Sequence, residues 1–190
     1  MPRKTPKTRR VKKSEWLEAA LRALVAGGIR NVRVETLARE LGVARSSFYW
    51  HFRDRQALLK EMLEHWSHEL TGIVIRDPEI NALPPAKRLA AISEIVSERH
   101  LAKYDAAIRQ WAQQDPMADR AAREVFRMRL VFLRRLFSEM GFEGDELEMR
   151  AHLFVIYASS ERDTMPELSR AKRKRMAPLR VELLTRPAKK

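Results

Sequence analysis

The chain has 190 residues, a formal net charge of +13 and no cysteine. Its length permits one large domain or two small ones, and an apolar content of 45% excludes a disordered protein. Without cysteine there are no disulfides and no thiolate metal sites, and the longest apolar runs, such as 153–158, are too short to cross a membrane.

The excess positive charge lies at the two ends of the chain. Residues 1–13 contain seven Lys and Arg and no acidic residue, and residues 170–190 contain nine against a single glutamate. We expect residues 1–13 to form a flexible basic arm and residues 185–190 a basic tail. Such ends attract any polyanion and do not choose among DNA, RNA and an anionic membrane. Because no apolar segment follows the basic start, we expect a cytoplasmic, nucleoid-associated protein.

The first predicted helix opens a head domain over residues 14–60. Ser14 is placed to cap this helix, and Gly27-Gly28 ends it. Its apolar residues recur at helical spacing and are Leu17, Ala20, Leu21, Leu24 and Val25.

Two short helical patterns follow, over 34–41 and about 45–51, with Gly42 between them. Their apolar positions recur every four residues and are Leu37, Leu41, Phe48 and Phe52. Gly42 stands where the chain must turn through a left-handed conformation, which a residue without a Cβ adopts most readily. Two short helices crossing through a tight glycine turn predict a helix-turn-helix.

The outer side of the helix predicted over 45–51 has the chemistry of a major-groove reader. It carries hydrogen-bonding and flat aromatic side chains, namely Arg45, Ser46, Ser47, Tyr49, Trp50 and His51. Arg45 could contact a guanine or a phosphate, and Arg33 and Arg55 would clamp the backbone on either side. A helix this short cannot bury all its aromatic residues on one face, so at least one large ring must project toward a partner.

A long fourth helix from about Asp54 into the low 70s is predicted to join the head to a helical body over 61–184. Three prolines interrupt residues 75–85. The body helices are then expected near 86–99, 101–113, 118–140, 145–161 and 167–184. Pro178 should kink or end the last of them. The fold class is therefore all-α.

Residues 16–63 resemble the DNA-binding head of the TetR family of bacterial repressors. The resemblance is carried by the opening apolar helix, the glycine near its end, LARELGV, and above all SFYWHFRDRQALL. It implies that the short third helix enters the major groove of duplex DNA. Two positions depart from the family pattern: Ala44 stands where Ser or Thr is usual, and Ser46 replaces a frequent glycine.

Dimerisation is expected through the last two long helices of the body. Residues 108–142 resemble one TetR subgroup, in which these helices form a four-helix bundle with their symmetry mates. The helix over 118–140 is apolar around more than half its circumference, which suggests two buried faces. A large monomeric core is the alternative. The residues assigned to the dimer interface are Leu133, Phe137, Leu147, Ala151, Phe154 and Ala158. Two recognition helices related by a twofold axis would read an inverted-repeat operator.

The resemblance also implies a pocket for an apolar small-molecule effector between the body helices. The residues assigned to its lining are Trp66, Tyr104, Trp111, Phe126 and Tyr157. Ligand binding there would shift the separation of the two heads and so release the operator. The alternative is that these aromatic residues are ordinary core.

Other functional classes find less support. His65 and His68 are three residues apart, but no HExxH order, phosphate loop or nucleophile elbow accompanies them. We expect no enzyme activity, no metal and no cofactor. A non-specific binder of nucleic acid or anionic surfaces, driven by the basic ends, remains the second interpretation.

Overall fold

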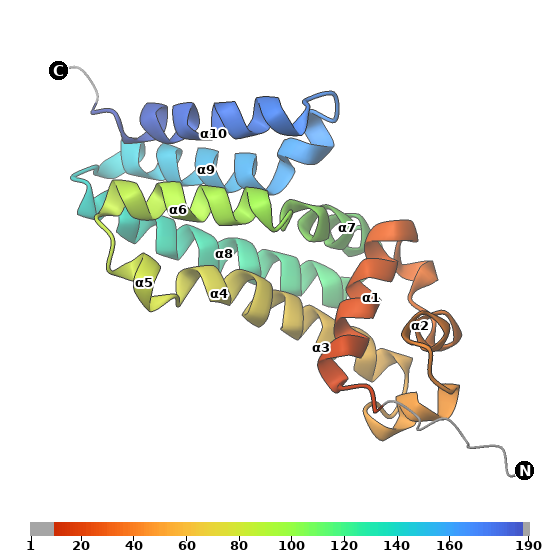
Figure 1. Ribbon diagram of the computed structural model, residues 1–190. Coiled ribbons are helices and arrows are strands. Elements are labelled where there is room, and N and C mark those ends of the chain that lie inside the picture. Colours follow the sequence, from red (N-terminus) through yellow and green to blue (C-terminus); the bar gives the residue numbers. More distant parts are fainter. Residues whose placement is uncertain (1–9, 188–190) are drawn as a thin grey trace, which may run out of the picture. The chain divides into compact units, whose positions relative to one another are not determined.

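The computed structural model describes residues 10–187, which contain helices and no strand (Figure 1). The predicted all-α class is confirmed. The chain divides into two compact units, Met1–His65 and Trp66–Lys190. Residues 1–9 of the expected arm and 188–190 of the expected tail lie outside the described part. No described helix is long and apolar enough to span a membrane.

The first unit consists of three α-helices and two short 3₁₀ helices. They are α1 (Lys13–Gly27), η1 (Ile29–Asn31), α2 (Val34–Leu41), η2 (Arg45–Trp50) and α3 (Arg55–His65). The core forms where α1 packs on α2 and α3. Its fully buried large side chains are Trp16, Leu21, Leu24, Leu37, Phe48, Leu58, Leu59 and Met62.

The start of α1 differs from the expectation. The N-cap residue is Lys12, so Ser14 lies inside the helix and is not its cap. The backbone N–H of Lys12 instead donates to the carboxylate of Glu15 at 2.8 Å. A carboxylate that reaches back in this way satisfies a free N–H and complements the positive end of the helix. The preceding residue, Val11, is buried, so the chain is already held against the unit at this point.

Gly42 forms the turn between α2 and η2 as predicted. Its φ of 68° and ψ of 32° are left-handed, and its N–H donates to the carbonyls at the end of α2. The N–H of Val43 donates to the carbonyl of Ala38 at 3.0 Å, which closes the turn. The turn therefore depends on backbone conformation that residues with a Cβ rarely adopt.

Replacing Gly42 with alanine should lower the free energy of unfolding by about 1–2 kcal/mol, the cost of a left-handed L-residue. A Cβ at this position would meet no atom within 4 Å, so the loss comes from backbone strain alone. Gly42→Asn is the matched control, because asparagine tolerates this conformation better. Urea denaturation of the two variants tests the prediction; equal losses, or none, would contradict it.

The second unit begins within the long helix that leaves the first. This helix continues α3 as a π-helical segment, η3 (Trp66–Thr71), followed by α4 (Gly72–Ile75). The remaining helices are α5 (Pro78–Asn81), α6 (Pro85–Glu98), α7 (Ala102–Ala112), α8 (Pro116–Glu139), α9 (Gly144–Thr164) and α10 (Arg170–Thr185). These limits follow the predicted body helices closely, but α10 passes through Pro178 without ending.

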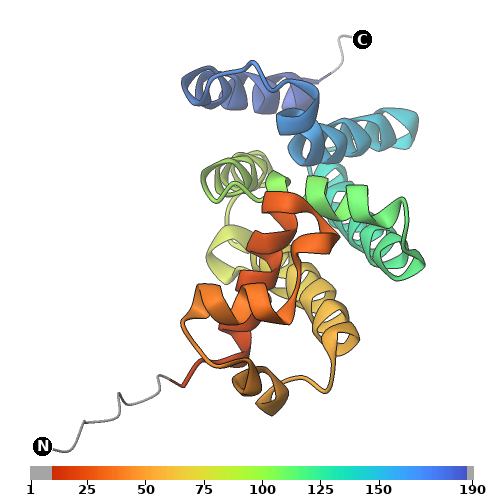
Figure 2. The ribbon, with the colours of Figure 1, turned by 90° about the vertical axis from the view of Figure 1, so that its right-hand side faces the viewer.

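The core of the second unit lies among α6, α8 and α9, while α7 packs on α8 and α9. Its large buried side chains include Leu89, Ile92, Leu133, Leu136, Phe137, Phe154 and Val155. The last helix, α10, lies against α6 (Figures 1 and 2). Arg150 of α9 holds the end of α10 by donating to the carbonyl of Leu184 at 2.6 Å.

Candidate nucleic-acid interface

The predicted third helix is present as the 3₁₀ helix η2. Ala44, its N-cap residue, has no side chain that can accept a hydrogen bond, and the element is only six residues long. A tighter helix is common in such short pieces. Phe48 attaches η2 to the unit: it is fully buried and lies 5.5 Å from Trp16 and 5.2 Å from Phe52, measured between ring centroids.

The two aromatic residues that follow Phe48 point away from the core. Tyr49 is 55% exposed and Trp50 is 86% exposed. Arg45 and Ser46 are also exposed, while Ser47 is half-buried. The expectation that at least one large ring must project outward is therefore confirmed. A large aromatic ring exposed to water is unfavourable, and a partner that stacks on the Trp50 ring or covers it would remove this apolar surface from solvent.

Arg45 is exposed and held in place by weak contacts. Its guanidinium lies 3.0 Å from a carboxylate oxygen of Glu35 and 3.5 Å from the hydroxyl of Tyr49. The hydrogen bond to Tyr49, and then the charge of Glu35, raise the pKa of Arg45 above its ordinary value. Exposed pairs of this kind contribute little to stability, so Arg45 can exchange them for a phosphate or a base edge.

Three of the predicted contact residues also support the local backbone. Nε2 of His51 donates to the carbonyl of Val11 at 2.9 Å, which ties the start of the described chain to η2. Arg55 donates to the carbonyls of Val32 and Ile29 at 2.7 and 2.8 Å, and Arg33 donates to the carbonyl of Arg30 at 2.9 Å. Sequence patterns carry no signal for side-chain bonds to backbone carbonyls, which for His51 and Arg55 lie 23 to 40 positions away, so these roles were missed.

Asp54 places the start of α3 directly after η2. One carboxylate oxygen accepts the N–H of Ala57 at 2.8 Å, and the other accepts from Arg53 at 2.9 Å. The bond from Ala57, and then the bond from Arg53, lower the pKa of Asp54. The aspartate therefore acts as an N-cap. It is a position that the sequence marked only as the beginning of the fourth helix.

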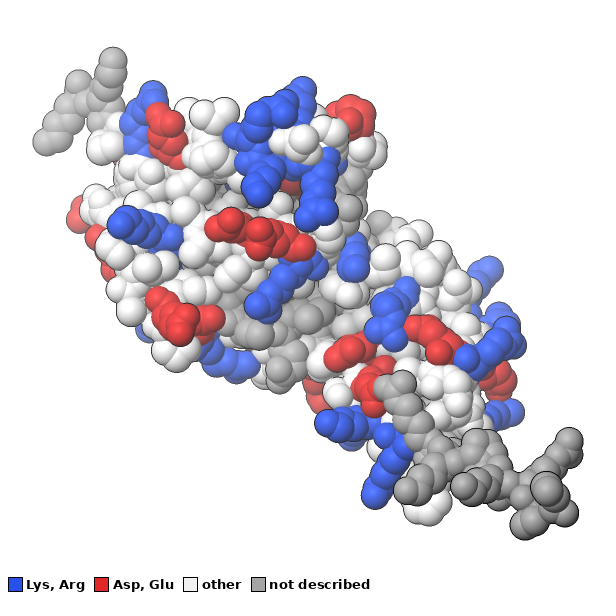
Figure 3. Space-filling view, viewed as in Figure 1, with Lys and Arg blue, Asp and Glu red and all other residues white. Residues whose placement is uncertain are grey.

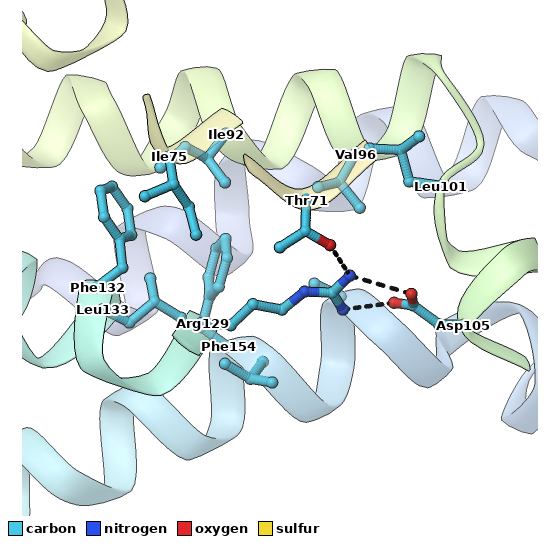
Figure 4. A pocket seen from close by; sticks show the side chains of 12 residues that line it. Thr71, Ile75, Ile92, Val96, Leu101, Asp105, Arg129, Phe132, Leu133 and Phe154 are labelled. Atoms are coloured by element: carbon cyan, nitrogen blue, oxygen red, sulfur yellow. Dashed lines mark hydrogen bonds and ion pairs between the residues drawn. The ribbon is translucent and has the colours of Figure 1, made fainter. Parts of the chain in front are cut away.

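The second unit contains an apolar cavity of about 60 Å³ with a polar end. Figure 4 shows Ile75, Ile92 and Phe132 at its apolar side. At the polar end, Arg129 donates to both carboxylate oxygens of Asp105, at 2.6 and 3.0 Å, and to the hydroxyl of Thr71 at 2.9 Å. Arg129 and Asp105 also border a second cleft of about 370 Å³.

The residues predicted to line one pocket lie at different places in the second unit. Trp66 and Phe126 border the second cleft, and the indole N–H of Trp66 donates to Asp105 at 3.1 Å. Trp111 is buried and donates to Asp115 at 3.1 Å. Tyr104 packs against the core beneath Lys103.

Tyr157 points toward the α10 side of the unit, where its ring lies under Arg180. Its hydroxyl donates to Glu161 at 2.5 Å. Burial, and then this hydrogen bond to a carboxylate, raise the pKa of Tyr157. The aromatic residues chosen from the sequence are thus not brought together around one cavity.

The assignment of dimer-interface residues needs correction. Leu133, Phe137, Ala151 and Phe154 are almost fully buried within a single chain, where they form the core between α8 and α9, and Leu147 and Ala158 pack against this core. Side chains that a chain has already buried cannot contact a second copy, which applies to the first four residues, whereas Leu147 and Ala158 are only half-buried. The large apolar residues that remain exposed on these helices include Phe126, Met149, Leu153 and Ile156.

Among the described residues, no group of three or more His, Asp or Glu side chains could hold a metal ion. His65 is the last residue of the first unit and His68 lies in the second, and neither belongs to such a group.

Comparison with known proteins connects the first unit to a family. Residues 17–62 match the family model described as bacterial regulatory proteins, tetR family. The uncharacterized HTH-type transcriptional regulator TtgW of Pseudomonas putida is 33% identical over 70 residues, which are 37% of this chain and 52% of that protein. The regulator AcrR of Shigella flexneri is 29% identical over 96 residues, 50% of this chain and 43% of that protein. The matches thus span about half the length of these relatives, or less.

Solved structures share the fold over nearly the whole chain. A transcriptional regulator FadR from Bacillus subtilis, in complex with stearoyl-CoA, has a TM-score of 0.70 at 15% identity and covers 92% of this chain and 98% of its own. A regulatory protein TetR from Rhodobacter sphaeroides has a TM-score of 0.71 at 19% identity, covering 89% and 96%. At these identities the likeness concerns the fold alone.

Proposed function

We propose that this chain is a DNA-binding transcriptional repressor of the TetR type, because residues 17–62 match the model of the tetR family of bacterial regulatory proteins. It binds an inverted-repeat operator as a homodimer, and a small-molecule effector releases it. In this proposal residues 14–60 bind DNA, and residues 61–184 dimerise and hold the effector.

The observation that carries the proposal is the pairing of a fully buried Phe48 with an 86% exposed Trp50 on one short helix. Phe48 holds η2 to α1, so the opposite side of η2 is presented rigidly to the outside. That side offers Arg45, Ser46, Tyr49 and Trp50 to a major groove and its flanking phosphates. His51, Arg33 and Arg55 act mainly by holding the backbone that positions these residues.

The proposed dimer surface is the exposed apolar face formed by Phe126, Met149, Leu153 and Ile156. The three α9 residues are spaced by four and three positions, so they form one stripe. Phe126 of α8 joins them, because it borders the same cleft as Ile156. A row of large apolar side chains in water is unfavourable, and pairing with a second copy removes it from solvent.

The proposed link between effector and DNA runs through η3. Trp66 and Thr71, the first and last residues of this π-helix, are hydrogen-bonded to the ion pair of Asp105 and Arg129. η3 follows directly on α3, the last helix of the DNA-binding unit. A ligand that displaces Arg129 or Asp105 therefore changes the support of the segment from which α3 extends.

Selection of bound fragments from random DNA tests the proposal. We expect an inverted repeat, bound by two chains per site. Titration of that operator with one chain per site would contradict the homodimer, and the absence of any enriched sequence would contradict the regulator.

Substitutions on η2 should weaken operator binding selectively. Arg45→Ala is expected to weaken it about 10- to 100-fold, within the range for loss of one base-reading contact. The readout is the ratio of operator affinity to random-DNA affinity at fixed salt. Lys60→Ala, an exposed residue of α3, is the charge-matched control and should leave the ratio unchanged. If Arg45→Ala, like the control, leaves this ratio unchanged because operator affinity and random-DNA affinity fall by the same factor, Arg45 contacts only phosphates.

The salt dependence of binding distinguishes specific operator binding from the second interpretation, a non-specific binder driven by the basic ends. Binding driven by the basic ends would fall steeply with ionic strength and show no preference among sequences. Specific binding retains a cognate-to-random ratio as salt increases.

A further inference from the structure

A cleft of about 400 Å³ lies beside α10 in the second unit. It is bordered by α6, by the last turns of α9 and by the first turns of α10. Its volume is within the range of about 300–1,000 Å³ that small-molecule sites occupy. Figure 3 shows Lys and Arg side chains gathered over the N-terminal half of α10.

The cleft carries more positive than negative charge. Arg170, Arg173 and Arg180 line it, against one carboxylate, that of Glu161. Glu161 lies 3.5 Å from Nη1 of Arg173 and 4.0 Å from Nη1 of Arg180. These separations are too long for good hydrogen bonds.

Several guanidinium donors in the cleft are left without an acceptor. Nη1 of Arg173 and Nε of Arg180 are buried and make no hydrogen bond. In the described part of the chain, Arg170 is exposed and has no ion pair. A buried donor without an acceptor costs free energy that an anion could recover.

The arginines are also held in fixed positions. Arg173 donates to the carbonyls of Leu168 and Met165 at 3.0 and 2.5 Å. Arg180 donates to Ser93 at 2.5 Å and stacks on the ring of Tyr157 at 4.2 Å. An anion bound here would not have to immobilise these side chains, which removes part of the entropic cost of binding.

The charged cleft shares a wall with the apolar cavity. Val96 of α6 and Ala158 of α9 border both. Beyond them, the cavity is lined mainly by aliphatic and aromatic side chains such as Ile92, Phe132 and Phe154. The charged cleft and the apolar cavity are therefore neighbours with two apolar residues between them, and one of these, Ala158, has a small side chain.

We propose that the cleft and the cavity together bind an amphipathic anion, with a carboxylate or phosphate group at Arg170, Arg173 and Arg180 and a hydrocarbon chain that passes Val96 and Ala158. This inference rests on the proposed effector-controlled function and names the chemical class of the effector. The cavity of about 60 Å³ accepts the first methylene groups, and a longer chain displaces the side chains that line it.

Calorimetric titration of the full chain tests both halves of the ligand. The probes are octanoate, decanoate, dodecanoate and decyl phosphate below their micelle concentrations, with acetate, inorganic phosphate and decanol as head-only and tail-only controls. We expect one site per chain, an affinity gain of about 3- to 4-fold for each added methylene, and much weaker binding of the controls. Carboxylate and phosphate heads are compared at the ten-carbon chain length, which identifies the preferred anion.

Three variants, one of them a control, test the residues that border the cleft. Arg170→Glu should weaken decanoate binding at least 5-fold, whereas Arg175→Glu, an exposed α10 residue that does not border the cleft, should leave it within 2-fold. Ala158→Leu places a larger side chain between the cleft and the cavity, and it should abolish the gain in affinity with chain length. Circular dichroism confirms that each variant folds.

Affinity that does not change with chain length, or equal losses in Arg170→Glu and Arg175→Glu, would overturn the inference, because either result indicates general attraction to a basic helix. Operator binding of the ligand-free chain is measured in parallel. If operator binding is intact and no amphiphile binds, only the effector class is wrong. If amphiphiles bind and no DNA sequence is selected, the repressor function is wrong.

Discussion

The variant Leu153→Arg/Ile156→Arg is expected to be monomeric at about 10 µM, where we expect the unsubstituted chain to be dimeric, and to lose about 100-fold or more in operator affinity. Both side chains are half exposed on α9, so arginine fits there without disturbing the core. In a dimer, however, the two copies would bring four buried guanidinium groups together without partners, which is strongly unfavourable. Sedimentation equilibrium and operator titration measure the two effects.

The matched control is Leu183→Arg. Leu183 lies on α10 and, at 66% exposed, resembles Leu153 and Ile156 in type and exposure but lies outside the proposed face. It should leave the dimer intact. Monomerisation by Leu183→Arg alone would place the interface on α10 and contradict the assignment to α9.

Replacing Asp105 with leucine is expected to lower the free energy of unfolding by about 3–5 kcal/mol, as when one partner of a buried ion pair is removed. Asp105 is 6% exposed and accepts hydrogen bonds from Trp66 and from two nitrogens of Arg129. Without the carboxylate, the indole N–H of Trp66 has no acceptor, and the guanidinium of Arg129 loses its countercharge and keeps only the hydroxyl of Thr71 as an acceptor. Urea denaturation followed by far-ultraviolet circular dichroism measures the loss.

Two comparisons identify the cause. Asp119→Asn breaks an exposed pair with Arg123 on the same unit and should change stability little. Asp105→Leu combined with Arg129→Met removes both charges and should recover a large part of the loss, because an apolar pair needs no compensating charge. If Asp105→Leu proves as mild as Asp119→Asn, the ion pair does not stabilise the second unit.

The same variants bear on the proposed signal path. The double variant lacks the bonds that hold Trp66 and Thr71, the two ends of η3, while retaining a packed interior. If this pair transmits effector binding to α3, the double variant should bind its operator and fail to release it on ligand addition. Measuring both the free energy of unfolding and the ligand-induced release from the operator on this double variant distinguishes an effect on packing from an effect on signalling.

Local features of the chain could be predicted because they depend on neighbours in sequence. The helical spacing of Leu37, Leu41, Phe48 and Phe52 and the position of Gly42 predicted the helix-turn-helix, and the left-handed turn confirms the conformation expected of that glycine. The surplus of aromatic residues on η2 likewise predicted that at least one ring must project, and both Tyr49 and Trp50 do so.

Contacts between distant segments could not be predicted in this way. Apolar periodicity indicates that a helix buries a face but not which element covers it, so Leu133, Phe137 and Phe154 were assigned to a dimer interface although α8 and α9 cover them with each other. The outward stripe of Met149, Leu153 and Ile156 on the same helix became visible only once that packing was known.

The amino-acid sequence by itself determined the helical class, the position of the helix-turn-helix and the two basic ends, because each depends on spacing or composition within a short stretch. The tertiary structure decided which charged and polar groups contact one another. Asp105 and Arg129 pair across 24 positions, and Arg180 reaches Ser93 across 87. The free energy of such pairs depends on distance and burial in the folded chain, and neither quantity is written in the order of residues.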